Sequence, residues 1–415
     1  MDSKKNVEYC HDLCLCADSN AQQIPPLTFL RPWYNLTLGY LSLAKLWEKA
    51  TKANAMHFSL YPHLAPCFPD YSKDQGNASL YIEAPLLPTP ALLAQLNALV
   101  PGEALYAKNQ LLAVRNHTNG LWGMHRGERG CADTLTARRE WDGSLTPAPL
   151  LSHPYDLFLL AKEGIDLAVT LYGNTFAHQT SGEKVQVIGP LDQLYIAPSA
   201  SLTACTLNTR KGPILIGEHA EIQEGAHLQG PLVLGDGVLV HMGSKLYGNS
   251  IIGARCKVGG ELDNVVFQNF SNKAHDGYLG NACLGSWCNI GAGSNCSNLK
   301  NNYDSIRVYD YNSQRFEQTG LQFCGLTMGD HSKCGINSMF NTGTLVGAFC
   351  NIFGAGFPRQ FIPSFSWGGA AGFSSHRLAD ALATAKVVMA RRQQPLTPEY
   401  QAAIEHLWQN TQAEK

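Results

Sequence analysis

The sequence predicts an α/β N-terminal domain, then a left-handed parallel β-helix of hexapeptide repeats, and finally a short helical C-terminal tail. The main observation is an aliphatic residue at every sixth position between residues 216 and 258. This period fits neither an amphipathic helix nor an ordinary strand, and it is typical of solenoids in which six residues make one short strand and one turn. The chain also combines 39 glycines with only 15% charged residues, which suits tight turns. The register consists of Ile216, Ile222, Leu228, Leu234, Val240, Leu246, Ile252 and Val258.

Length and charge exclude several classes of protein. The chain has 415 residues, enough for two or three domains, and its formal net charge of −2 gives no global basic field for nucleic acid. No apolar run approaches the roughly 20 residues of a membrane span, and no signal-peptide core follows residues 1–5. The 13 cysteines are scattered, which indicates reduced thiols. We therefore expect a cytoplasmic protein with no membrane and no nucleic-acid partner.

Residues 1–180 are expected to form the α/β domain and its connector to the solenoid. Leucines recur on one face in two segments, which predicts helices there. Short apolar runs bounded by polar turns predict strands. The expected helices are 41–50 and 89–100, and the expected strands begin at Tyr81 and cover 104–106 and 111–114.

Two features of this domain leave alternatives open. Cys10, His11, Cys14 and Cys16 lie close together, but no second ligand pair with zinc-like spacing follows, so no metal is assigned and a strand carrying thiols is the alternative. Arg31 precedes the first expected helix, where it either binds a phosphate or holds the loop in place.

Residues 185–374 are expected to form the β-helix. The six-residue spacing breaks after Val258, resumes in a displaced frame, and is regular again from 328 to 352. A polar excursion at 299–320 interrupts it. Without the excursion, the spacing accounts for about eight coils of about 18 residues.

Residues 375–415 are expected to form a helical cap. Two helices are expected within it, at 376–392 and 397–412, and the second opens with a threonine followed by proline, a favourable start. A strand edge at the end of a solenoid invites unwanted pairing. We therefore expect these helices to cover that edge.

Polar residues gather where the register breaks. They occupy Glu261, 271–280, 288–293 and 297–303. His275 is the candidate general base, because the reference pKa of histidine lies near neutral pH. The alternative for His275 is an ordinary histidine in a surface turn. His331 is the rival base, and its alternative role is a hydrogen bond that stabilises a corner of the solenoid.

Four motifs in this part of the chain are distinctive. They are 271–277 (SNKAHDG), 297–303 (SNLKNNY), 320–326 (GLQFCGL) and 328–335 (MGDHSKCG). With the YLG of 278–280 and the NIGAG of 289–293, they resemble an alternative bacterial branch of the bifunctional N-acetylglucosamine-1-phosphate uridyltransferase / glucosamine-1-phosphate N-acetyltransferase family.

The resemblance implies acetyl-CoA-dependent N-acetylation of an amino sugar 1-phosphate, with glucosamine 1-phosphate favoured. It also implies a homotrimer whose sites form between subunits. The implied catalytic residues are His275, Glu261 and Asn298. The implied substrate contacts are Lys245, Tyr278, Asn289, Lys273 and Lys300, with Arg31 added as a loop cation. Ala292 is implied to line the path of the pantetheine arm.

Two positions depart from the family pattern. Lys245 stands where the family has a phosphate-binding arginine, and a lysine lacks the bidentate fork. Asp263 stands where the family has its next basic phosphate ligand, so we expect Lys273 or Lys300 to compensate. The alternative is a different acceptor, either another hexose phosphate or a nucleotide-linked sugar.

The segment 26–32 (PLTFLRP) with Gly39 resembles a sugar nucleotidyltransferase. This implies uridylyl transfer from UTP with Mg²⁺, giving UDP-N-acetylglucosamine for the cell envelope. The usual glycine-rich nucleotide loop is absent, and no aspartate pair for Mg²⁺ is evident. A hexapeptide scaffold with a non-catalytic nucleotide-binding head is therefore a further alternative.

Overall fold

The computed structural model describes residues 12–19, 23–71, 78–117, 122, 134–143, 146–178 and 182–412. The chain divides into two compact units. Unit 1 comprises residues 1–23, 32–35 and 42–152, and unit 2 comprises residues 24–31, 36–41 and 153–415. Two short N-terminal segments and the connector after residue 152 therefore group with the solenoid.

Unit 1 is built on a six-stranded mixed sheet in the order β2-β1-β3-β5-β4-β6. β1 runs parallel to both its neighbours, β5 runs antiparallel to both of its own, and β6 is parallel to β4. This confirms the α/β prediction and the expected strand pair. The strands are β1 (Leu13–Ala17), β2 (Met56–Leu60), β3 (Leu80–Ile82), β4 (Glu103–Ala107), β5 (Gln110–Arg115) and β6 (Ala137–Glu140).

Both helices expected in unit 1 are present. In α1 (Leu43–Thr51) the side chains of Leu43, Leu46 and Trp47 are buried. α2 (Pro90–Asn97) is capped by Thr89, whose side chain accepts a hydrogen bond from the Leu92 amide at 3.3 Å. Unit 1 also contains two short 3₁₀ helices, η2 (Trp33–Asn35) and η3 (Ala65–Cys67).

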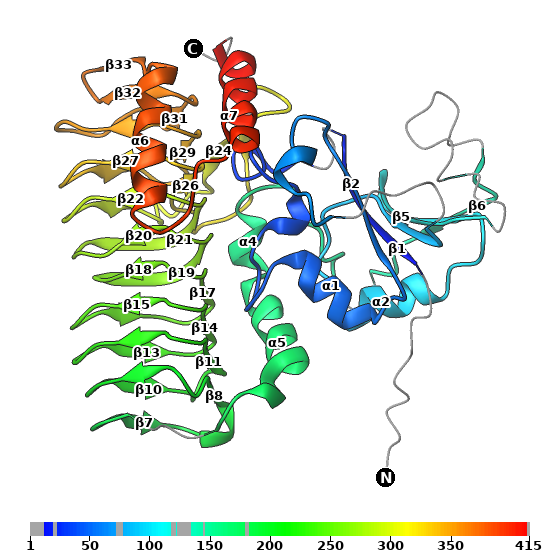
Figure 1. Ribbon diagram of the computed structural model, residues 1–415, viewed down its shortest axis with the longest axis horizontal. Coiled ribbons are helices and arrows are strands. Elements are labelled where there is room, and N and C mark those ends of the chain that lie inside the picture. The colour runs from blue at the N-terminus through cyan, green and yellow to red at the C-terminus, as the bar shows by residue number, and fades with distance from the viewer. Residues whose placement is uncertain are drawn as a thin grey trace. The chain divides into compact units, whose positions relative to one another are not determined.

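Unit 2 is a parallel β-solenoid with three faces, stacked rung upon rung (Figure 1). Face A consists of β8 (Leu194–Ile196), β11 (Ile214–Ile216), β14 (Leu232–Leu234), β17 (Ser250–Ile252), the ends of β19 (Glu261–Phe267) and β21 (Tyr278–Leu284), β26 (Thr327–Met328), β29 (Leu345–Val346) and β31 (Phe361–Ile362). Face B consists of β9 (Ser201–Leu202), β12 (Glu221–Ile222), β15 (Leu239–Val240), β18 (Lys257–Val258), β20 (Asn272–Lys273), β22 (Asn289–Ile290), β27 (Lys333–Cys334), β30 (Asn351–Ile352), β32 (Ser366–Gly369) and β33 (Gly372–Ser375). Face C consists of β7 (Gln186–Ile188), β10 (Thr206–Asn208), β13 (His227–Gln229), β16 (Lys245–Leu246), the starts of β19 and β21, β23 (Asn295–Cys296) and β28 (Met339–Phe340).

The hexapeptide register forms the core, as predicted. All eight aliphatic residues of the register are at most 2% exposed, and they belong to one continuous apolar cluster. Stacked coils bury this column because each coil covers the next.

The number of coils is larger than the sequence predicted. Face B holds ten strands, of which all but β33 are parallel, and β7 adds a partial first turn, so the solenoid has about ten turns instead of about eight. The spacing of inward residues explains the difference. Val240 pairs in register with Val258, 18 residues later, but Val258 pairs with Lys273, only 15 residues later (273 − 258). Counting in sixes loses the frame at that short coil.

Two departures from the solenoid match the sequence. The expected excursion carries an antiparallel hairpin of β24 (Arg307–Asp310) and β25 (Arg315–Gln318). Before the solenoid, the connector contains α4 (Asp156–Leu159), α5 (Ala161–Tyr172) and η5 (Gly173–Thr175), and η6 (Leu191–Gln193) lies between β7 and β8. In the described part of the chain, no helix is long and apolar enough to cross a membrane.

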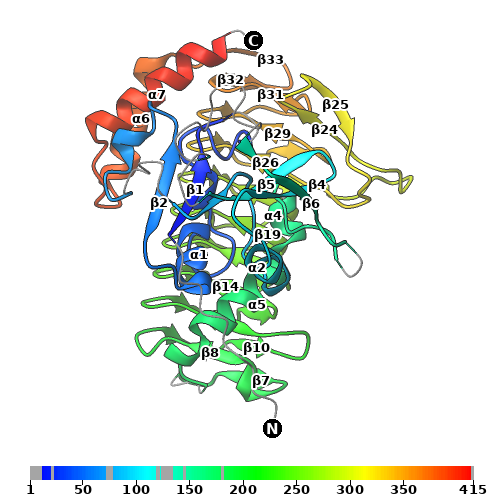
Figure 2. The same ribbon diagram turned by 90° about the vertical axis from the view of Figure 1, so that its right-hand side faces the viewer.

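Both expected C-terminal helices are present, as α6 (Leu378–Ala390) and α7 (Pro398–Thr411), but their place differs from the expected cap. The edge of β32 is covered by the antiparallel strand β33. α6 lies beside the later coils (Figure 2), and the residues after it contact face B: Arg392 Nη2 donates to Asn272 Oδ1 at 2.9 Å. These helices therefore contribute side chains to a face of the solenoid.

Candidate functional site

His275 lies at the corner where each coil passes from face B to face C, in the turn 274–277 between β20 and β21. Its side chain is exposed. It borders a cavity of about 660 Å³ between face B and the end of α6. The cavity is lined by His241, Lys257, Phe270, Asn272, Ala274, His275, Trp287, Asn289, Lys333, Val388, Arg391 and Arg392.

The cavity is cationic. Lys257, Lys333, Arg391 and Arg392 reach it from three elements, and none of the described lining residues is acidic. Arg392 is fixed by its bond to Asn272 and by a second bond from Nη1 to the Arg255 carbonyl at 3.2 Å. Burial lowers the pKa of the neighbouring His241, and the charges of Lys257 and His275 lower it further. Such a site favours an anionic ligand.

Face C brings three of the expected residues into one row. Lys245, Glu261 and Tyr278 are register partners on adjacent strands, and Lys245 Nζ lies 3.4 Å from Glu261 Oε2. Asn298 joins them, because its Nδ2 donates to the Tyr278 hydroxyl at 3.0 Å and to Asn281 Oδ1 at 2.7 Å. Burial raises the pKa of Tyr278 to about 12, so its hydroxyl keeps its proton and can donate to a ligand.

Asp263 places a second carboxylate on this face, two residues after Glu261 on β19. It is half-buried, and burial raises its pKa, as does the charge of Glu261, while Lys211 lowers it. Lys245 is paired with Glu261, and the cation that acts on Asp263 is Lys211, so each of these lysines already faces an acid. A phosphate group would be poorly neutralised here.

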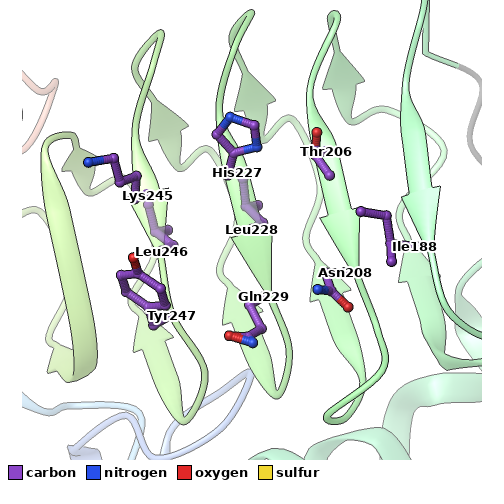
Figure 3. A pocket seen from close by; sticks show the side chains of 9 residues that line it. All are labelled: Ile188, Thr206, Asn208, His227, Leu228, Gln229, Lys245, Leu246 and Tyr247. Atoms are coloured by element: carbon purple, nitrogen blue, oxygen red, sulfur yellow. The ribbon is translucent and has the colours of Figure 1, made fainter.

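A shallow pocket of about 350 Å³ continues face C from Lys245 toward the start of the solenoid. Figure 3 shows its polar side chains in two rows across three strands, with apolar residues between them. In the hydrogen bonds among described residues, the side chains of His227, Gln229 and Tyr247 are not engaged, so they are available to a ligand. The first row is Thr206, His227 and Lys245, and the second is Asn208, Gln229 and Tyr247.

Two lysines that were expected to compensate for Asp263 lie elsewhere. Lys273 occupies the inward position of β20 and is 0% exposed; its ammonium donates to the carbonyls of His275 and Asp276. Lys300 Nζ donates to the Ser305 carbonyl at 2.7 Å, within the excursion. These contacts favour structural roles for both lysines over the expected binding of substrate phosphate, because both ammonium groups donate to main-chain oxygens.

Arg31 holds a loop and does not face open solvent. It forms an ion pair with Asp330, whose side chain is 1% exposed, and its Nη1 donates to Ser286 Oγ at 2.9 Å. Both partners belong to the solenoid. Of the two roles left open by the sequence, these contacts favour holding the loop over binding a phosphate.

His331, the rival base, is buried at the corner between faces A and B. Its ring stacks on Phe349 with centroids 4.6 Å apart, and Nε2 lies 3.1 Å from the Tyr400 hydroxyl. Burial holds its pKa well below 6.5, helped by Lys333 and Arg31. The ring is one of a column of stacked side chains, Phe270, Trp287, His331, Phe349 and Phe365, all with φ between +54° and +66°. Its surroundings favour the structural alternative.

Asn289 and Ala292 lie apart from the row on face C. Asn289 is exposed on face B, 3.4 Å from Asn272 Nδ2 through its Oδ1. Ala292 occupies the B–C corner one coil after His275, and its carbonyl accepts from the Asn337 amide at 2.7 Å. In one chain, the expected residues thus divide between the cavity on face B and the row on face C.

The sequence alone did not single out Lys257, Arg391 or Arg392. The sequence did contain a signal for Lys257, because on face B the residue just before each inward-facing residue of the register faces outward. Lys257, Asn272, Asn289 and Lys333 are successive register partners at those positions. The arginine pair ends the helix predicted at 376–392, but the direction of the two side chains depends on how that helix packs.

The cysteine cluster gives no metal site in the described chain. Cys14 and Cys16 are both buried within β1, with their sulfur atoms 3.9 Å apart. Cys10 and His11 lie outside the described residues. Among the residues that are described, no group of three metal-ligating side chains occurs.

Comparison with known proteins finds a family match in the first part of the chain. Residues 13–172 match the family model of the sugar nucleotidyl transferases. This part of the chain is nucleotidyl transferase-like. Over 145 residues the chain is 32% identical to a bifunctional sugar-1-phosphate nucleotidylyltransferase/acetyltransferase of Sulfurisphaera tokodaii, a match covering 34% of this chain and 36% of that relative. These matches confirm the resemblance to bifunctional sugar nucleotidyltransferase/acetyltransferases that the motifs indicated.

Solved structures similar to the chain include several hexapeptide-type transferases. The UDP-N-acetylglucosamine acyltransferase of Campylobacter jejuni is 13% identical, with 51% of this chain and 94% of that chain covered and a TM-score of 0.22. The corresponding enzyme of Francisella novicida is 14% identical, with 56% and 78% covered and a TM-score of 0.24. Because these TM-scores are far below 0.5, we draw nothing about function from them.

Proposed function

We propose that the solenoid transfers an acetyl group from acetyl-CoA to the amine of an amino sugar phosphate, with His275 as general base. The observation that carries the proposal is the exposed His275 at the mouth of a cationic cavity. Acetyl-CoA combines a polyanionic nucleotide with a neutral pantetheine arm, and Lys257, Arg391 and Arg392 supply positive charge for the former. Ala292, at the same corner one coil further on, would line the arm.

The chemical step follows from the position of His275. The amine nitrogen of the sugar attacks the thioester carbonyl, His275 accepts the proton that the nitrogen loses, and the C–S bond breaks to release CoA as a thiolate that is then protonated. General-base catalysis of this kind contributes about 10²–10⁴-fold. Tyr278 and Asn298 would hold the sugar hydroxyls through hydrogen bonds, and Glu261 would fix Lys245 toward the sugar phosphate.

A homotrimer accounts for the division of the site between two faces. Asn289 and the cavity lie on face B, whereas Tyr278 and Lys245 lie on face C. If a second copy supplies the missing face, each active site contains residues of two chains. This proposal rests on the separation of the expected residues, and the mass of the assembly in solution tests it.

We further propose that unit 1 transfers a uridylyl group from UTP to the acetylated sugar 1-phosphate in the cytoplasm, giving UDP-N-acetylglucosamine. The match of residues 13–172 to sugar nucleotidyl transferases supports it. This reaction class requires Mg²⁺ to neutralise the triphosphate. Release of pyrophosphate from UTP and N-acetylglucosamine 1-phosphate tests it, and calorimetry with UTP, with and without Mg²⁺, separates a catalytic head from one that only binds nucleotide.

The acetyl step is tested by comparing wild type with His275→Ala, using acetyl-CoA and glucosamine 1-phosphate. We expect kcat to fall by about 10²–10⁴-fold, because the amine loses its proton acceptor. The exposed position predicts that the variant folds normally, which its melting temperature checks. Undiminished turnover by His275→Ala would exclude this base.

A second candidate acceptor, a nucleotide-linked amino sugar, is favoured by Asp263 and by the pocket on face C. The carboxylates of Glu261 and Asp263 on face C disfavour a terminal phosphate, and the unengaged side chains of the adjoining pocket offer room for a longer substrate. A panel containing glucosamine 1-phosphate and UDP-linked amino sugars distinguishes the two. A clear preference for glucosamine 1-phosphate would rule out the second candidate.

A further inference from the structure

The turn that carries His275 lacks a main-chain hydrogen bond that closes several other turns at the B–C corner. In three comparable turns, a main-chain hydrogen bond joins the first residue to the fourth: Gln223 to Ala226 at 3.4 Å, His241 to Ser244 at 3.3 Å, and Gly291 to Ser294 at 3.3 Å. No corresponding bond from Gly277 to Ala274 occurs among the described residues of the turn 274–277. The turn 335–338 also lacks this bond, and there Ser338 Oγ donates to the Gly335 carbonyl at 2.8 Å, so a side chain can close such a turn instead.

Lys273 supplies such a side chain from inside the coil. It occupies the inward position that Val258 holds in the preceding coil, and its side chain is 0% exposed. Its ammonium donates to the carbonyl oxygens of His275 and, at 3.0 Å, of Asp276. The Asp276 carbonyl also accepts the Gly293 amide at 3.0 Å, which ties the turn to the following coil.

A buried lysine in an apolar column is costly unless its charge finds partners. The neighbouring inward residues on face B are apolar, including Val240, Val258 and Ile290. Burial lowers the pKa of Lys273 to about 8, against the opposing charge of Asp276, so the ammonium persists at neutral pH. An aliphatic residue here would pack without this cost, but it would leave both carbonyls without their internal donor.

The preceding coil packs closely against the turn 274–277. Its corner is reduced to Gly259 and Gly260, and a Cβ at Gly259 would lie 2.3 Å from the Ala274 carbonyl oxygen. A Cβ at Gly260 would lie 2.8 Å from the carbonyl oxygens of both His275 and Gly277. The turn is thus held from within by Lys273 and approached closely from the adjacent coil by two glycines.

We propose that Lys273 is a positioning residue for the acetyl transfer: by binding the His275 and Asp276 carbonyls from inside the solenoid, it fixes the main chain from which the His275 ring reaches its substrate. This inference rests on the proposed role of His275. Lys273 touches neither substrate nor acetyl-CoA in this proposal, and it acts through the geometry of the turn.

The test measures kcat and KM of acetyl transfer for Lys273→Met, Lys273→Arg and Gly260→Ala. Lys273→Met keeps the packing volume and removes the donor, so kcat should fall roughly 10–100-fold, as expected for a misplaced catalytic group, while KM for acetyl-CoA stays within about twofold. Lys273→Arg keeps N–H donors and should retain more activity than Lys273→Met. Gly260→Ala places a methyl group against the His275 carbonyl while Lys273 stays intact, so kcat should fall in this variant too. It therefore tests the inference even if Lys273→Met does not fold.

Val258→Ala is the matched packing control, since it alters the register partner of Lys273 without touching the turn carbonyls. It should lower the melting temperature and leave kcat unchanged. Wild-type kcat in folded Lys273→Met and in Gly260→Ala would overturn the inference, as would an equal loss of kcat in Val258→Ala. If His275→Ala is inactive while these variants are fully active, only the positioning role fails; if His275→Ala is fully active, the assignment of the base itself fails.

Discussion

His275 and His331 both occupy corners of the same solenoid, but the corners differ in kind. His275 is exposed at the B–C corner beside a cationic cavity, and its turn is held by a buried lysine. His331 is buried at the A–B corner between Trp287 and Phe349, with its neutral ring in a stacked aromatic column. The same residue type in similarly polar sequence thus has opposite surroundings. Burial within the coil, more than the corner or the neighbours in sequence, decides whether a histidine is available for chemistry, since His219 at the A–B corner of an earlier coil is exposed.

If this comparison is right, changes at the A–B corner should cost stability and changes at the B–C corner should cost catalysis. The largest effect on stability is expected from Asp330→Ala. This change leaves Arg31 buried without its ion pair and removes the acceptor of the Ser286 amide at 2.7 Å. Breaking a buried pair from one side costs about 3–5 kcal/mol of unfolding free energy.

Denaturant unfolding of Asp330→Ala measures that loss, and kcat of the folded protein should remain close to wild type. The exposed pair of Arg377 and Asp380 provides the control, because Asp380→Ala removes an ion pair of α6 at the surface. A similar loss of unfolding free energy in both variants would show that the buried ion pair at the A–B corner contributes no more to stability than the exposed pair.

An intermediate effect, on ligand binding, is expected from Arg391→Ala. Its guanidinium lies at the cavity beside His275 and has no partner among the described side chains. If it binds a phosphate of acetyl-CoA, KM for acetyl-CoA should rise roughly tenfold, the effect of losing a charge-assisted hydrogen bond of about 1.5 kcal/mol, with kcat little changed. Arg377→Ala, at the opposite end of α6, should leave KM unaltered. Equal KM values for acetyl-CoA in the two variants would show that Arg391 does not bind acetyl-CoA in this cavity.

The smallest effect is expected from His331→Phe, which continues the aromatic column. Because the folded pKa of His331 lies below its unfolded value near 6.5, the folded state binds fewer protons, and stability is lost as pH falls below that value. Lys333 and Arg31 oppose the protonated ring, and Tyr400 lies at its Nε2. His331→Phe should therefore lose less stability than wild type between about pH 6.5 and 5. Parallel pH-unfolding curves for the two proteins would contradict the buried, neutral state of this ring.

The sequence predicted the elements and the regular part of the fold well. Spacing alone identified the inward residues from Ile216 to Val258, because a β-helix repeats one local rule. The frame was lost at the 15-residue coil that ends at Lys273, since counting in sixes cannot detect a shortened corner. Lys273 therefore resembled a surface ligand in sequence, although it is an inward residue.

The part of the site that depends on contacts between residues far apart in the sequence could not be predicted. His275, Tyr278 and Lys245 followed from motifs, but the arginines of the cavity depend on the packing of α6 against face B. Arg31 resembled a loop cation because its partner, Asp330, lies 299 residues away. Such pairings are set by tertiary contacts that local patterns do not encode.

The most direct measurement compares the initial rate of acetyl transfer from acetyl-CoA to glucosamine 1-phosphate in His275→Ala and His331→Phe, side by side with wild type. The comparison of corners predicts a loss of about 10²–10⁴-fold in His275→Ala and a rate near wild type in folded His331→Phe. A loss confined to His331→Phe, or an equal loss in both folded variants, would contradict it.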